Sequence, residues 1–329
     1  MVSLSKIIEE EYADVARADI TSIRNNSDLD IAKKIIAKRE ELMYGAFFEG
    51  DHVEKIFGTV YEETHFEKKD IINLCYAISE YQDIFKASGK NDFSDFGYIL
   101  SQLINIHHKI TRENDYLIKT DHLIEPLSYL GFENNGAHII IKGNTGYDTC
   151  KNMKSGTVEI FGNALSHFGY RMRGGNVILN GNAEDRVGEE LIEGTIEIKG
   201  SVKNHLGNQA SGGTIIVEKN AGAFVGSEMG EAKIIVKGDC DNVIGDSQQG
   251  GEITIFGNAG FQIGYCLQNG KITLHGNTKD YVGDSMQGGE IHLHGEYGGI
   301  SPRMYRGNIF HKGMRMSYPN AVFRSIENW

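Results

Sequence analysis

Hydrophobic residues in the second part of the chain recur with a period of 19 residues. Each unit opens with glycine or alanine, and the second and fourth residues after the opener are aliphatic, as in Val158 and Ile160. This alternation predicts a β-strand whose aliphatic side chains lie on one face. The openers mark nine units, at Ala137, Gly156, Gly175, Gly194, Gly213, Ala232, Gly251, Gly270 and Gly289.

Two further apolar columns keep the same period. One contains Phe168, Val187, Leu206, Val225, Ile244, Ile263 and Val282, and the other contains Met153, Met172, Leu191, Met229, Leu267 and Met286. A single unit cannot bury three apolar walls, whereas stacked coils bury them against one another. We therefore predict a right-handed parallel β-helix of about nine 19-residue coils over residues 136–313, because connections between parallel strands of one sheet are almost always right-handed.

Glycine fills two more columns of the repeat, as expected where a narrow coil requires positive φ or close backbone approach. One begins at Gly143 and is broken by Lys219, and the other runs from Gly169 to Gly283. Polar residues stand beside the former column, at Asn144, Asn163, Asn182, Ser201, Asn220, Asp239, Asn258 and Asn277. Since asparagine suits turns and can bond to neighbouring coils, we interpret this column as a structural ladder rather than a row of ligand-binding groups.

Residues 1–135 follow a helical pattern instead. Apolar residues recur at helical spacing in 27–45, 68–89 and 94–114, and residues 120–131 predict a shorter helix with Pro126 in its first turn. We expect an acidic bundle of five or six helices, which makes the fold class α + β. The repeat fails at Pro302, and residues 314–329 are predicted to cap the last coil.

Composition and charge exclude several classes of binding partner and cofactor. The net charge is -12, and residues 1–135 carry most of it, with 15 Lys and Arg against 25 Asp and Glu. This balance argues against binding to nucleic acid or anionic membranes and favours protein partners or neutral small molecules. The chain lacks an apolar run of about 20 residues, and its acidic start is untypical of a secretory leader. The four cysteines are widely spaced, which predicts reduced thiols in the cytoplasm and no bound cofactor.

Several side-chain groups are candidates for chemistry. His107 and His108 are adjacent, but neighbouring helical residues point about 100° apart, so a shared metal is not expected. His275 and His294 face outward on adjacent coils with His292 nearby, yet their columns contain no further ligand, and we predict no metal there. A titratable column, a candidate for binding an anion or a partner, contains Asp148, His167, Arg186 and His205.

An apolar stripe on the exterior is the clearest sign of a partner. Ile140, Ile178, Ile216 and Ile235 alternate with the core-facing residues and should point away from the coil axis. A stripe of β-branched residues on the outside of an isolated domain usually marks a surface that another domain or protein covers. We therefore predict that either the helical domain or another protein lies against them. The partners expected for the chain as a whole are protein subunits of an enzyme complex or, by self-association, further copies.

Units such as "MRGGNVILNGNAEDRVGEE" and "VGDSMQGGEIHLHG" resemble the GXGXG-motif β-helix over residues 136–313. That family includes the C-terminal domain of the glutamate synthase large subunit and one of the subunits of formylmethanofuran dehydrogenase. The resemblance implies an architectural element that packs against catalytic domains, and it offers no catalytic residue to carry over.

We therefore expect a non-catalytic architectural or assembly subunit of a cytoplasmic enzyme complex. The alternative is a stand-alone hydrolase or transferase with a site between the helical domain and the β-helix. That alternative requires a nucleophile, a base and oxyanion donors in one pocket, and the sequence shows no such local motif.

Overall fold

The computed structural model describes residues 28–38, 51–87 and 96–316. Its core is a β-solenoid of about ten turns with mostly parallel strands, preceded by helices. The described residues up to Gly169, together with Gly175–Gly181, form one compact unit. Tyr170–Gly174 and the described residues from Asn182 onward form a second unit.

Four helices lie in the described residues of the first unit: α4 (Asp28–Ala37), α6 (Asp51–Thr64), α7 (Lys68–Ala87) and α8 (Phe96–Thr111). The patterns at 68–89 and 94–114 thus correspond to α7 and α8. The helix expected over 27–45 ends at Ala37, and residues 39–50 lie outside the described part of the chain. Apolar side chains such as Phe57, Ile71 and Ile99 are fully buried between these helices.

The short helix predicted over residues 120–131 is wrong. These residues form turns and bends whose carbonyls bond to the following coil. The carbonyls of Leu127 and Leu130 accept from the backbone N–H groups of Gly146 and Cys150 at 2.7 and 2.8 Å. Hydrogen bonds to a neighbouring coil therefore replace the intrahelical ones that the spacing suggested.

The solenoid also begins earlier than the repeat indicated. Strand β1 (Asp115–Lys119) pairs in parallel with β2 (Asn135–Lys142), with Leu117 opposite Ile140. The first unit continues with β3 (Ser155–Phe161) and with β4 (Arg173–Leu179) from Gly175 onward. The second unit contains β5 (Glu193–Ile198), β6 (Thr214–Val217), β7 (Lys233–Val236), β8 (Glu252–Ile255), β9 (Lys271–Leu274), β10 (Glu290–Leu293), β11 (Asn308–His311) and β12 (Met314–Arg315).

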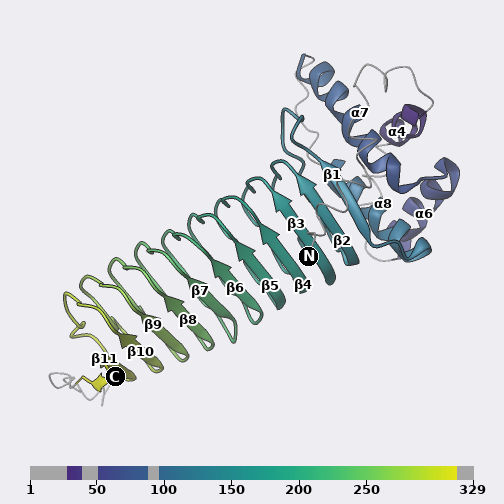
Figure 1. Ribbon diagram of the computed structural model, residues 1–329. Helices are drawn as coiled ribbons and strands as arrows, with labels where there is room; N and C mark the ends of the chain where they lie inside the picture. The colour runs from purple at the N-terminus through teal and green to yellow at the C-terminus, as the bar shows by residue number, and fades with distance from the viewer. Residues whose placement is uncertain (1–27, 39–50, 88–95, 317–329) are drawn as a thin grey trace, which may run out of the picture. The chain divides into compact units, whose positions relative to one another are not determined.

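Each coil contributes one strand, and neighbouring strands within a unit run in the same direction (Figure 1). The β11–β12 pair is antiparallel. Between β10 and β11 the register advances by 18 residues, since Glu290 lies opposite Asn308, so the coil containing Pro302 is one residue shorter than the repeat. Of the predicted capping segment, residues 317–329 lie outside the described residues.

The predicted apolar columns form the interior, and members such as Phe168, Ile263 and Met286 are fully buried. Ala210 and Gln248 occupy the two gaps in the methionine and leucine column, and both are also fully buried. The Gln248 side-chain amide donates to the carbonyl oxygen of Gly250 at 2.7 Å. The amide nitrogen is thus satisfied by coil carbonyls, whereas the buried Oε1 has no hydrogen-bond partner among the described residues.

The glycine columns have different physical causes. Gly264 has φ +71°, whereas Gly276 is required by close approach, because an added Cβ would lie 2.2 Å from the carbonyl oxygen of Gly257. Positive φ is not confined to glycine, since Val243 adopts φ 63°. Close approach between coils therefore restricts a position to glycine more strictly than a positive φ does.

No helix in the described ranges is both long and apolar enough to cross a membrane.

Candidate functional site

The predicted asparagine column makes hydrogen bonds from one coil to the next. The Oδ1 atom of Asn144 accepts from the backbone N–H of Asn163 at 2.8 Å, and Oδ1 of Asn182 accepts from Ser201 at 2.9 Å. The same contact joins each residue to the next in the series Asn220, Asp239, Asn258, Asn277 and Glu296, at 2.6–3.0 Å. These side-chain oxygens are used to hold successive coils in register.

Sequence reasoning missed a second polar column. The Oδ1 of Asp185 accepts from the backbone N–H of Asn204 at 2.9 Å, and Oδ1 of Asn204 accepts from Ala223 at 3.0 Å. Asn242 makes the equivalent contact with Phe261 at 3.0 Å. The sequence carries an interrupted signal for this column, because Asp185, Asn204, Asn242 and Asp280 keep the 19-residue spacing while Ala223 and Phe261 stand between them.

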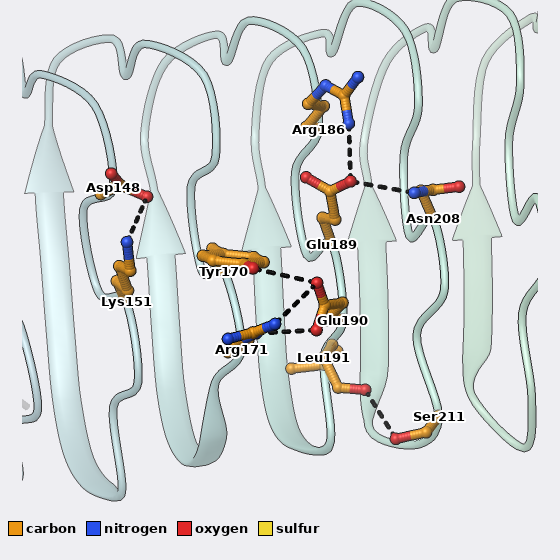
Figure 2. Close-up of polar contacts among 10 residues, drawn as sticks. All are labelled: Asp148, Lys151, Tyr170, Arg171, Arg186, Glu189, Glu190, Leu191, Asn208 and Ser211. Carbon is orange, nitrogen blue, oxygen red and sulfur yellow. Dashed lines mark hydrogen bonds and ion pairs between the residues drawn. The ribbon is translucent and has the colours of Figure 1, made fainter.

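The charged members of the titratable column pair with residues of their own coils. The Asp148 carboxylate lies 3.5 Å from Nζ of Lys151, and the Arg186 guanidinium donates to Glu189 at 2.7 Å. Figure 2 shows both side chains directed at these partners. Such local pairing favours a structural role over an anion site.

The two histidines of that column share its backbone conformation. His167 and His205 have φ 63° and 61°, close to the 57° and 64° of Asp148 and Arg186. The His205 ring stacks on Phe224 with 4.9 Å between centroids. The column is therefore a repeated left-handed corner of the coil.

A carboxylate cluster that sequence reasoning did not single out lies close to Arg186 in the chain. Glu190 accepts from Nε of Arg171 at 2.7 Å and from the Tyr170 hydroxyl at 3.0 Å (Figure 2). The hydrogen bond from Arg171 lowers the pKa of the Glu190 carboxyl. Because this group stays ionised and paired, it is unsuited to act as a general acid at neutral pH.

The three outward histidines divide into two stacks. His275 lies between Phe256 and His294, with ring centroids 4.7 and 4.8 Å away. His292 stacks on Phe310 at 4.6 Å, and its Nε2 lies 2.9 Å from Oε2 of Glu290. Burial and the neighbouring charges of His275, His292 and Lys271 lower the pKa of His294.

Because the rings stack in parallel, their nitrogen atoms do not point toward one common position, as the ligands of a metal ion would. Sequence reasoning followed only the columns and missed Glu290, which faces the same side two residues before His292. Within the described part of the chain, no group of three or more His, Cys, Asp or Glu residues could hold a metal ion.

His107 of α8 lies in an aromatic box. Its Nδ1 is 2.9 Å from the Tyr116 hydroxyl oxygen, and the rings of Tyr61 and Phe66 lie 6.0 and 6.3 Å away. Burial lowers the pKa of this imidazole. The adjacent His108 lies 2.6 Å from the carbonyl oxygen of Glu113. The two histidines thus have separate environments.

The thiols are poor candidates for nucleophiles. Burial raises the pKa of Cys75 and Cys240 to about 12, and it also raises the pKa of Cys150. A thiol with such a pKa has a negligible thiolate population at neutral pH. Cys266 is partly exposed.

The four isoleucines of the exterior stripe differ in how far other residues bury them. Ile140 is 1% exposed, because Ile72 of α7 and Leu117 of β1 pack against it. The helical segment of the first unit therefore covers the outward face of β2. Ile178, Ile216 and Ile235 are only partly buried in the described structure.

Comparison with models of known protein families and with curated proteins finds no match to this chain.

Proposed function

We propose that this protein is a non-catalytic architectural or assembly subunit of a cytoplasmic multi-subunit enzyme complex, of the glutamate synthase or formylmethanofuran dehydrogenase type. The observation that carries the proposal is the outward stripe of isoleucine. Ile140 is covered within the chain, whereas Ile178, Ile216 and Ile235 lie partly exposed on a regular sheet face. A partner that covers them would remove apolar surface from water.

The solenoid suits such a role because its surface is rigid and its spacing is fixed. Side-chain oxygens of the asparagine column bond to the next coil, and the interior columns are fully buried. A scaffold of this kind places bound domains at multiples of the coil spacing, about 4.8 Å. We further propose that the coils wind right-handed and that the helices of the first unit form a bundle.

The reactive groups described above support a structural role over catalysis. The acidic and basic side chains of the titratable column pair locally, the histidine rings stack, and the buried thiols have raised pKa values. Catalysis would require several such groups to converge on one reacting atom.

Replacement of Ile178 by Asp tests the proposal. Asn176 lies on the same strand, is already polar and is exposed, so Asn176→Asp is the matched control. A carboxylate buried against a partner is costly. We expect Ile178→Asp to abolish co-elution with the other subunits after purification from the native host, while the β-sheet circular dichroism stays unchanged.

Asn176→Asp should leave the complex intact. Co-elution of Ile178→Asp at the wild-type level, or enzymatic turnover by the purified chain alone, would count against a scaffold that binds through this stripe.

A further inference from the structure

We propose that the outward face of strands β6–β11 is a self-complementary interface for a second copy of this chain. This interface lies in the second unit and takes up Ile216 and Ile235, so Ile178 of the first unit is left as the position through which the scaffold binds other subunits. The interface requires no other subunit, so it goes beyond the scaffold role and can be tested on purified protein.

Three columns of side chains make up this face, aligned by the parallel register of the strands. The central column contains Ile216, Ile235, Thr254, Thr273, His292 and Phe310. The first flanking column, two residues earlier on each strand, contains Thr214, Lys233, Glu252, Lys271, Glu290 and Asn308. The second flanking column, two residues later, contains Glu218, Lys237, Phe256, His275, His294 and Lys312.

The central column holds two isoleucines, two threonines and two aromatic rings, and the first flanking column is mostly charged. The second flanking column has charged residues at its ends and aromatic rings in its middle. Phe256 is 51% exposed although its ring stacks on His275. The side chains of Lys233 and Glu252 are 50% and 57% exposed and lie 3.9 Å apart. A neutral centre with a charged rim is the usual composition of a specific protein interface.

The sign of the charge alternates along the first flanking column, and this alternation selects a second copy as the partner. Consider a two-fold axis parallel to the strands and midway between β8 and β9. Such an axis lays β8 over β9, β7 over β10 and β6 over β11 of the other copy. Glu252 then faces Lys271 of the second copy, and Lys233 faces Glu290 of the second copy.

The other two columns match under the same axis. In the central column, Ile216 meets Phe310 of the second copy and Thr254 meets Thr273. In the second flanking column, Glu218 meets Lys312 of the second copy. Lys237 meets His294, an imidazole whose pKa is lowered by burial and neighbouring charges and which therefore stays neutral at neutral pH.

Neighbouring positions of the axis are less favourable. An axis on β8 would place Lys233 against Lys271, and an axis on β9 would place Glu252 against Glu290. Like charges held face to face oppose association. The axis between β8 and β9 is the one that pairs all four alternating charges and uses six strands.

The area of this face suits a weak but specific dimer. Six strands about 4.8 Å apart, each spanning about five residues from the first flanking column to the second, cover about 500 Å² per copy. The total of about 1,000 Å² lies at the lower end for specific interfaces. We therefore expect a dimer in dynamic equilibrium with the monomer.

Charge exchange tests the two-fold pairing. Lys271→Glu and Glu252→Lys should each raise the dimer dissociation constant by at least about tenfold, because two like-charged pairs replace two attractive ones. An equimolar mixture of the two variants should form a heterodimer, since opposite charges face each other again. The double variant should regain the wild-type dimer for the same reason. Lys279→Glu, an exposed lysine that belongs to none of the three columns, is the control.

The measurement is sedimentation velocity of the full purified chain over a concentration series, with circular dichroism to verify each variant's sheet content. If a variant loses its sheet signal, the pair Lys233→Glu and Glu290→Lys provides the same test. A monomeric wild type, or single variants that fail to recover association when mixed, would overturn the proposal. The Ile178→Asp experiment measures other subunits, so the scaffold proposal and this one can fail independently.

Discussion

Gly276→Ala is the sharpest test of how the coils are held together. An added Cβ would lie 2.2 Å from the carbonyl oxygen of Gly257 and 2.5 Å from its carbonyl carbon. Both atoms belong to the backbone of the preceding coil, so a side-chain rotation cannot relieve the contact. Ordinary van der Waals distance lies about 1 Å further away, so the two coils must separate or change their local backbone conformation.

That separation weakens the hydrogen bond from Gly276 N–H to the Gly257 carbonyl, now 3.1 Å. Overpacking costs about 1–3 kcal/mol and a lost hydrogen bond about 1 kcal/mol, so we expect a loss of about 2–4 kcal/mol. Lys219 shows how the chain tolerates a side chain in this column. Its N–H lies 3.3 Å from the Gly200 carbonyl, against 3.0 Å for the equivalent bond from Gly257 to Gly238.

Gly230→Ala is the matched control, because the atom nearest to its added Cβ, the Ser211 Cα, would lie at an ordinary contact distance of 3.4 Å. The assay is urea unfolding followed by circular dichroism of the β-sheet. Since a solenoid need not unfold in one step, the midpoints of the sheet transition are compared. Equal midpoints for Gly276→Ala and wild type, or an equal loss in Gly230→Ala, would refute the close-approach argument.

Three further predictions concern other parts of the molecule. Gly264→Val should cost about 2–4 kcal/mol, because the added Cβ lies 2.5 Å from Cδ1 of the buried Ile291, and an unchanged melting temperature would contradict this. Chelators should leave the melting temperature and any assembly intact, since the outward histidines stack instead of converging; loss of a stoichiometric metal with a large drop in melting temperature would show otherwise. The lowered pKa of His107 means that the folded state resists its protonation, so the helical signal at 222 nm should lose thermal stability as the pH falls below about 6.5. His107→Gln should flatten that pH dependence, and an equally steep profile in this variant would assign the titration to another group.

The solenoid was predictable from the sequence because each coil repeats its pattern. Val158 and Ile160 alternate as their counterparts do on every later coil, and the structure buries both. Residues 120–131 were not predictable in this way, since they lack the glycine repeat. Their apolar residues have helical spacing, and Pro126 stands where proline is common in the first turn of a helix. Their hydrogen-bond partners lie about 20 residues further on, and local propensity does not include such partners.

The candidate surface was only partly predictable. The alternation of inward and outward residues placed Ile216 and Ile235 on the exterior, but it could not show that Ile72 of α7 covers Ile140. The stacks of His275 on Phe256 and of His292 on Phe310 required the register between strands. Glu290 was missed because the column pattern ignores neighbours along one strand.

The asparagine column also gives the solenoid a direction. Each side-chain oxygen accepts from a backbone N–H 19 residues later, as Asn258 does from Asn277, so within the column the acceptor is synthesised before its donor. Domains tend to fold from the N-terminus during synthesis. A coil leaving the ribosome therefore meets an acceptor already held in place by the coil before it. The ladder can act as a template that sets the register of each new coil, so the chain can assemble vectorially.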